Sequence, residues 1–182
     1  MINPDGLLEH ARRLAGQGRG RPPEADLRRG ISAAYYAVFH DLTDRAARHL
    51  IGSAPASARD ALRRTWSHGE LAAAAEIAVE RAKTTTANPR APATGEIAKA
   101  GPLADLAAND TDLVNALRLF SELQEKRHQA DYEHNARYEK LTLLDTCRDA
   151  ASARALLGSA SSTSREALFT LLTVRRRDFQ PR

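Results

Sequence analysis

One helical stripe of this chain is apolar at one end and polar at the other. Steps of three or four residues select Leu103, Leu106, Asp110, Leu113, Leu117, Phe120, Gln124, Arg127, Asp131 and His134 in turn. Residues at this spacing share one face of a helix. The leucine end predicts burial against a core, whereas a helix gains no stability from burying the polar end. The polar end is therefore the first candidate for a functional site.

Similar patterns predict helices along most of the chain. We expect a first helix at about 4–15, a long helix at about 22–50 opened by Pro22-Pro23, and one or two helices at 57–79 with a break near 67–69. The stripe helix follows from residue 103 and breaks or bends near His134, another helix covers about 136–157, and a last one covers about 163–178. Thr163 and Glu166 have the spacing of a capping box for this last helix.

The segment 84–101 predicts a long mobile loop, because its threonines and prolines disfavour a helix. The long helix before it is apolar over a wide arc, with Tyr35 on one side and Tyr36 and Phe39 on another. Such a helix is either central in its own subunit or shared with a second one. The whole pattern predicts an all-α, up-and-down bundle of five to seven helices, formed by a single domain over 1–182 with its core at about 22–157.

Composition agrees with a helical fold and argues against a membrane-spanning, secreted or disulfide-linked protein. The 182 residues are rich in alanine, leucine and arginine, which favour helices. The sequence contains no run of about 20 apolar residues, the length that spans a membrane, and no secretory signal is recognised. We therefore expect a cytoplasmic protein without a membrane partner. The single cysteine, Cys147, rules out an internal disulfide and a cysteine-based zinc site. It is expected in the core, as is Trp66.

The net charge of +4 comes from arginine, which occurs in clusters such as Arg28-Arg29 and Arg175-Arg176-Arg177. Guanidinium groups match the geometry of phosphate oxygens, so the charge is compatible with a nucleic-acid partner. The same clusters also fit helices that are simply solvated by arginine. Charge alone leaves both interpretations open.

Arg127 and His134 suggest a specific reaction. They are seven positions apart, which on a straight helix corresponds to roughly 10 Å of rise. Histidine can transfer protons at neutral pH, and a guanidinium can stabilise charge on a phosphoryl group. The pair suits metal-independent cleavage of RNA, in which a ribose 2′-hydroxyl attacks the adjacent phosphate. The simpler alternative is an exposed histidine and an ordinary ion pair between Arg127 and Asp131.

A family resemblance supports the first interpretation. The run from Arg28 to His40, RRGISAAYYAVFH, resembles the signature helix of the HEPN superfamily (higher eukaryotes and prokaryotes nucleotide-binding domains), and the run from Arg127 to Tyr132 resembles the matching later segment. Ribonucleases of this superfamily carry an arginine, usually a polar residue directly after it, and a histidine after four to six intervening residues. Arg127, His128 and His134 match that pattern at the longest spacing, with six residues between.

The resemblance implies a helical bundle that forms a homodimer, with the Arg-His pairs of both copies facing one cleft. By analogy, Arg127 would hold the scissile phosphate and His134 would act as general base or acid. His128, Asp131 and Tyr132 would be supporting residues. The chain departs from the pattern at Ala136, because toxins that a nucleotidyltransferase silences often have a tyrosine there. The resemblance therefore does not extend to that form of regulation.

The sequence thus predicts a metal-independent endoribonuclease, and the expected partners are RNA, a second copy of the chain, and an antitoxin or defence-system protein. We expect no cofactor. A cation at His128, Asp131 and His134, or near His40 and His49, is a minor alternative. Two other functions remain open: a catalytically inactive HEPN-fold partner of a nucleotidyltransferase or another defence subunit, and a basic accessory protein that binds nucleic acid.

Overall fold

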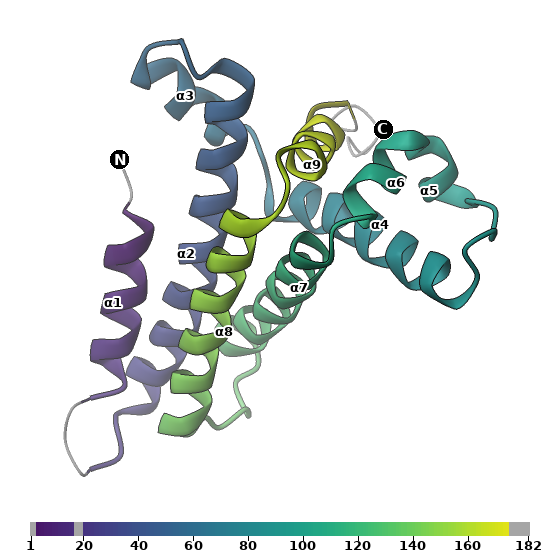
Figure 1. The fold of residues 1–182 in the computed structure, drawn as a ribbon. Coiled ribbons are helices and arrows are strands. Elements are labelled where there is room, and N and C mark those ends of the chain that lie inside the picture. Colours follow the sequence, from purple (N-terminus) through teal and green to yellow (C-terminus); the bar gives the residue numbers. More distant parts are fainter. Residues whose placement is uncertain (1–2, 17–19, 175–182) are drawn as a thin grey trace. The chain divides into compact units, whose positions relative to one another are not determined.

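The computed structural model describes residues 3–16 and 20–174, and every regular element within these ranges is an α-helix (Figure 1). The helices are α1 (Pro4–Leu14), α2 (Glu24–Ile51), α3 (Ala56–Arg63), α4 (His68–Ala87), α5 (Gly95–Ala100), α6 (Pro102–Ala108), α7 (Thr111–Tyr132), α8 (Lys140–Ser159) and α9 (Ser162–Val174). The all-α class predicted from the sequence is confirmed. The described part has nine helices rather than the expected five to seven. The segment predicted as a loop contains α5, and the predicted stripe helix is split into α6 and α7.

The described chain forms two compact units. Unit 1 takes its residues from Met1–Leu42 and Leu119–Ala155, and unit 2 from Thr43–Arg118 and Leu156–Arg182. Helices α2, α7 and α8 each contribute a part to both units. The single domain expected from the sequence stays a prediction, since compactness does not show whether either unit folds independently.

The core of unit 1 forms around the first half of α2. Tyr35 is fully buried and stacks on Phe120 of α7, with ring centroids 5.6 Å apart. Gly30 allows close packing on α8, because a Cβ atom at this position would lie 2.6 Å from a methyl group of Leu143. Cys147 is 2% exposed, as expected for a core residue, and burial raises the pKa of its thiol to about 11 against the opposing charge of Arg12.

Unit 2 contains α4 and short helices that pack on it. Helix α6 contacts both α9 and α4, and Trp66, just before α4, is 4% exposed, which confirms it as a core residue. Ser67 and Glu70 form a reciprocal capping box at the start of α4, with Glu70 N–H donating to Ser67 Oγ at 3.2 Å and Ser67 N–H donating to Glu70 Oε2 at 2.6 Å. Two orphan amides at this helix start are thereby satisfied.

The predicted stripe helix is interrupted. Helix α6 ends at Ala108 and α7 begins at Thr111, because the Asp110 carboxylate accepts a hydrogen bond from Leu113 N at 2.9 Å and caps α7. The periodicity of apolar residues continues across this break, which is why the sequence predicted one helix. Leu106, expected to be buried on the stripe, is 42% exposed.

The predicted loop over 84–101 is also largely helical. Helix α4 extends to Ala87, where the hydroxyls of Thr84 and Thr85 donate to the carbonyls of Glu80 and Arg81, one turn earlier. Helix α5 begins at Gly95. Only residues 88–94 and Gly101 lack helix in this segment. The prediction of a long loop was therefore wrong, because threonines whose hydroxyls bond to the preceding turn did not end α4.

Two further boundaries differ from expectation at the C-terminal end. Helix α9 begins at Ser162 and is capped by Ser161, whose Oγ accepts from Ser164 N at 3.2 Å, so the capping box predicted at Thr163 is wrong. Residues 175–178 of the expected last helix lie outside the described residues. Helix α8 begins at Lys140 rather than near Ala136.

Asp110 gives a testable link between pH and stability. Partial burial raises its pKa, but hydrogen bonds from the backbone of Ser161 and Leu113 outweigh this and lower the pKa below 3.8. Folding therefore gains stability from ionised Asp110 above the unfolded pKa, and loses it as pH falls through the folded pKa. Asp110→Ala should lower the free energy of unfolding by about 1–2 kcal/mol at pH 7, measured by urea denaturation.

The difference between wild type and Asp110→Ala should shrink as the pH drops below 3.8. Asp110→Asn is the matched control, because asparagine also caps helices but does not ionise in this range. A destabilisation by Asp110→Ala that stays constant from pH 7 to pH 2.5 would contradict the assigned role of the carboxylate.

Candidate functional site

Arg127 lies in the last turns of α7, where its side chain is held from several directions. Its Nε is 2.6 Å from Asp131 Oδ2, one helical turn further on, and its Nη2 donates to the Tyr36 hydroxyl at 3.3 Å. The guanidinium carbon is 5.7 Å from the centroid of the Tyr36 ring and 5.6 Å from that of Tyr132, within cation–π distance of both. With a side chain 18% exposed, Arg127 is largely fixed in place.

The electrostatics keep this guanidinium charged. Partial burial lowers the pKa of Arg127, but Tyr36, Asp131 and Tyr132 outweigh it and raise the pKa above its ordinary value. Burial likewise raises the pKa of Tyr35, against the opposing charge of Arg127. The site therefore presents a permanent positive charge with fixed orientation.

Helix α2 supplies the partners of this arginine. Ser32 Oγ donates to Asp131 Oδ1 at 2.5 Å, while Tyr36, one turn further along α2, contacts Arg127. Ser32 and Tyr36 therefore face Asp131 and Arg127 with matching one-turn spacing on the two helices. The simple ion pair that the sequence allowed for Arg127 and Asp131 is present, but it belongs to a larger network.

Aromatic contacts extend the network on both sides. The Tyr36 ring stacks on His40, with centroids 5.9 Å apart, and the Tyr132 ring lies 5.0 Å from that of His128. Sequence analysis missed His40 and Ser32 as parts of this site. The signal was available, because Ser32, Tyr36 and His40 recur at intervals of four residues and form a polar stripe on α2.

His134 lies apart from this network. It occupies an exposed turn after the end of α7 at Tyr132, and Ala136 N–H closes the turn by donating to Glu133 O at 3.2 Å. Within residues 3–16 and 20–174, no hydrogen bond, ion pair or ring contact joins His134 to Arg127. The structure thus brings together Arg127, His128, Asp131 and Tyr132, and places His134 on the adjacent turn.

Arg28 of α2 determines how α7 ends. Its Nη1 donates to Ala130 O at 2.8 Å, and its Nη2 donates to Glu133 O at 3.0 Å and Ala136 O at 2.5 Å. Ala130 O belongs to the last turn of α7, whose carbonyls have no partner inside the helix, whereas Glu133 O and Ala136 O belong to the turn that follows. Glu24 pairs with Arg28 at 3.5 Å and also accepts from Tyr138 N at 3.1 Å. The turn that carries His134 is therefore tied to α2, a role of Arg28 that sequence analysis did not predict.

Apolar side chains are exposed near the same turn. Of the four large hydrophobic residues exposed in the described chain, three lie in unit 1: Tyr132 (59% exposed), Leu141 (61%) and Leu144 (38%). They come from the end of α7 and the beginning of α8. Exposed hydrophobic residues gathered in one part of a chain are typical of an interaction surface.

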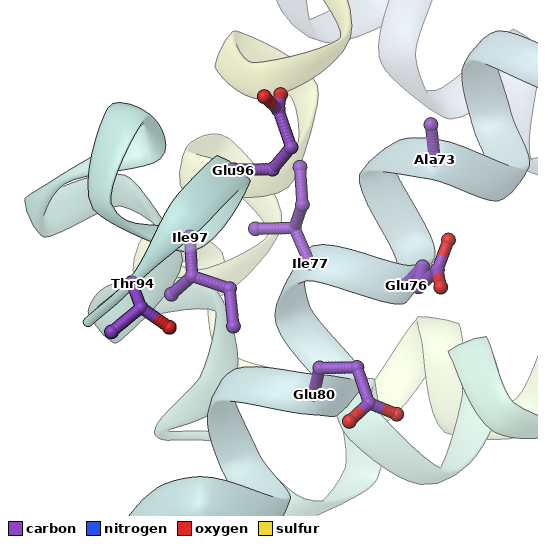
Figure 2. Close-up of a pocket in the computed structure, with 7 residues that line it drawn as sticks. All are labelled: Ala73, Glu76, Ile77, Glu80, Thr94, Glu96 and Ile97. Atoms are coloured by element: carbon purple, nitrogen blue, oxygen red, sulfur yellow. The ribbon is translucent and has the colours of Figure 1, made fainter. Parts of the chain in front are cut away.

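A pocket of about 320 Å³ lies in unit 2, between α4 and α5 (Figure 2). Ile77 and Ile97 point toward each other across it, and the carboxylates of Glu76, Glu80 and Glu96 lie around them. It contains none of the predicted site residues. Its carboxylates disfavour a phosphate ligand by charge repulsion.

The described residues contain neither a candidate metal site nor a helix that could span a membrane. No group of three or more His, Cys, Asp or Glu side chains in this part of the chain is arranged to hold a metal ion. No helix within the same residues is long and apolar enough to cross a membrane.

Comparisons with protein-family models, with curated proteins and with solved structures give no match for this chain. Function is therefore inferred from the geometry of the site.

Proposed function

We propose that this protein is a metal-independent endoribonuclease of the HEPN type that acts as a toxin or antiphage defence component. The observation that carries the proposal is the orientation of Arg127 by Tyr36, Asp131 and Tyr132, directly before the turn with His134. Arg127 is held by more contacts than a solvated surface arginine has, and its side chain is 18% exposed. A fixed guanidinium suits a phosphate whose charge increases during reaction.

The proposed reaction needs no group beyond the chain and RNA. The ribose 2′-oxygen loses its proton to a histidine and forms a bond to the adjacent phosphorus, while the bond from phosphorus to the 5′-oxygen breaks. The leaving 5′-oxygen takes a proton from an imidazolium. The products are a 2′,3′-cyclic phosphate and a 5′-hydroxyl. Arg127 stabilises the charge on the non-bridging oxygens, and His134 transfers protons.

A second copy of the chain would complete this site. One proton is removed and another is donated, and a symmetric dimer supplies His134 twice, so that one imidazole can act as base while the other acts as acid. The exposed Tyr132, Leu141 and Leu144 are an apolar surface that such a partner would cover.

Leu141→Glu combined with Leu144→Glu should convert the dimer to a monomer, because a buried unpaired carboxylate opposes association. Sedimentation equilibrium at about 10 μM protein checks this. Leu106→Glu, at a residue 42% exposed in unit 2, is the matched control and should remain dimeric. A dimer that survives the double substitution would contradict this surface as the interface.

An inactive binding partner of a nucleotidyltransferase or another defence subunit is the second candidate. It is favoured by the close ion pair between Arg127 and Asp131, at 2.6 Å. That pair lies within α7, and together with the hydrogen bonds from Ser32 to Asp131 and from Arg127 to Tyr36 it would equally hold α2 and α7 together without any reaction.

Cleavage of total cellular RNA in the presence of EDTA decides between the two candidates. The ribonuclease should produce fragments that end in a cyclic phosphate, and His134→Ala should abolish them. His10→Ala, which changes an exposed histidine on α1 in the same unit, is the matched control and should cleave like wild type. Intact RNA with dimeric wild-type protein would favour the inactive partner, and cleavage that survives His134→Ala would contradict the proposed site.

A further inference from the structure

A second candidate binding site lies beside the turn that carries His134. It is a hollow of about 630 Å³ in unit 1, lined by Gly20, Arg21, Arg137, Tyr138, Glu139 and Lys140. Its size falls in the range of ordinary ligand sites. Three of its side chains are cationic and one is anionic, so the hollow favours an anion.

The cations have a defined framework. Arg21 donates to Tyr138 O at 3.2 Å and pairs with Glu24 at 3.2 Å. Glu24 in turn accepts from Tyr138 N at 3.1 Å. The backbone at Tyr138 is thus fixed to the start of α2, and Arg137 and Lys140 are presented on either side of it.

Tyr138 is one of the residues that line the hollow and is only 8% exposed. Its hydroxyl oxygen is buried and has no hydrogen-bond partner among the described residues. A buried polar group without a partner costs about 1–3 kcal/mol. Burial raises the pKa of Tyr138, against the opposing charge of Arg28, so the hydroxyl remains a donor at neutral pH. A ligand oxygen that reaches it would remove that cost.

The position of the hollow indicates which ligand. Arg137 follows His134 by three residues, and three extended residues span at most about 11 Å. A strand cleaved beside His134 would therefore pass within reach of Arg137 and Lys140. Cationic grooves that follow the backbone are how proteins hold single strands without reading their sequence.

We propose that the hollow formed by Arg21, Arg137, Tyr138 and Lys140 binds a backbone phosphate of single-stranded RNA, next to the phosphate that is cleaved. The choice of RNA rests on the proposed ribonuclease function. The binding test below does not depend on cleavage.

The test measures binding of a fluorescent single-stranded RNA of about 20 nucleotides in which every ribose carries a 2′-O-methyl group. This probe cannot be cut by 2′-hydroxyl attack. Arg137→Ala with Lys140→Ala should weaken binding at least tenfold at 100 mM salt. Loss of two phosphate contacts should also reduce the slope of log K against log salt by about 1.4. Arg13→Ala with Arg148→Ala removes the same charge from exposed positions of unit 1 and should change affinity less than threefold.

Tyr138→Phe separates a binding role from a structural one. It removes the buried hydroxyl without a cavity, so thermal stability should stay the same or rise, while RNA affinity falls several-fold. The groove variant is Arg137→Ala with Lys140→Ala, and the charge control is Arg13→Ala with Arg148→Ala. Equal loss of binding in these two variants would overturn the proposal. Unchanged affinity in both Tyr138→Phe and the groove variant would also overturn it. If unmodified RNA stays intact with wild type while the groove variant still binds less tightly, the ribonuclease proposal fails and the groove stands.

Discussion

Arg127→Ala should reduce RNA cleavage by about 100- to 1,000-fold, the usual effect of removing one preorganised group that stabilises charge in a transition state. In the structure this guanidinium is 2.6 Å from Asp131 and is contacted by two tyrosine rings, so no other side chain can simply replace it. Affinity for the 2′-O-methyl probe should fall less than tenfold, since several cations contribute to binding. Initial rates on a single RNA, with EDTA present, measure the first effect.

Arg127→Lys keeps the charge but loses the planar fork. We expect it to recover less than a tenth of the wild-type rate. Arg148→Ala removes an exposed arginine of unit 1, 72% exposed, and should leave the rate unchanged. Because Arg127 also balances the charge of Asp131, thermal unfolding of each variant must be compared. A folded Arg127→Ala dimer that cleaves within threefold of wild type would refute the role of Arg127.

Arg28→Ala should lower the free energy of unfolding by about 2–4 kcal/mol, because hydrogen bonds from a charged donor contribute more than neutral ones and the carbonyls lose their partner. Arg28 donates to the carbonyls of Ala130, Glu133 and Ala136, and its guanidinium lies 5.2 Å from the centroid of the Tyr138 ring. Urea denaturation measures the loss.

Arg29→Ala is the matched control, since Arg29 is the adjacent residue on α2 and is exposed. It should change stability by less than about 0.5 kcal/mol. Hydrogen exchange locates the effect: amides of residues 133–138 should exchange faster in Arg28→Ala than in Arg29→Ala. A destabilisation without faster exchange at the turn would mean that Arg28 stabilises the unit in another way.

The sequence by itself determined the class of the fold and the part of the candidate site that lies on α7. Helices α1 and α2 and the break before α4 follow from local signals, namely proline at helix starts, apolar spacing and the residues at 67–69. The pairs Arg127 with Asp131 and His128 with Tyr132 are also local, because residues four positions apart on one helix are neighbours.

Only the tertiary structure decided what these residues contact. Tyr36 is 91 positions from Arg127, and Arg28 is 102 positions from Ala130, so no local pattern could pair them. The end of α7 and the exposed position of His134 depend on the contacts of Arg28. The start of α7 depends on Asp110, a local cap that also accepts a hydrogen bond from Ser161 N, 51 positions away. Periodicity shows which face of a helix is apolar, whereas the hydrogen bonds at its ends, some of them from distant residues, decide where it starts and stops.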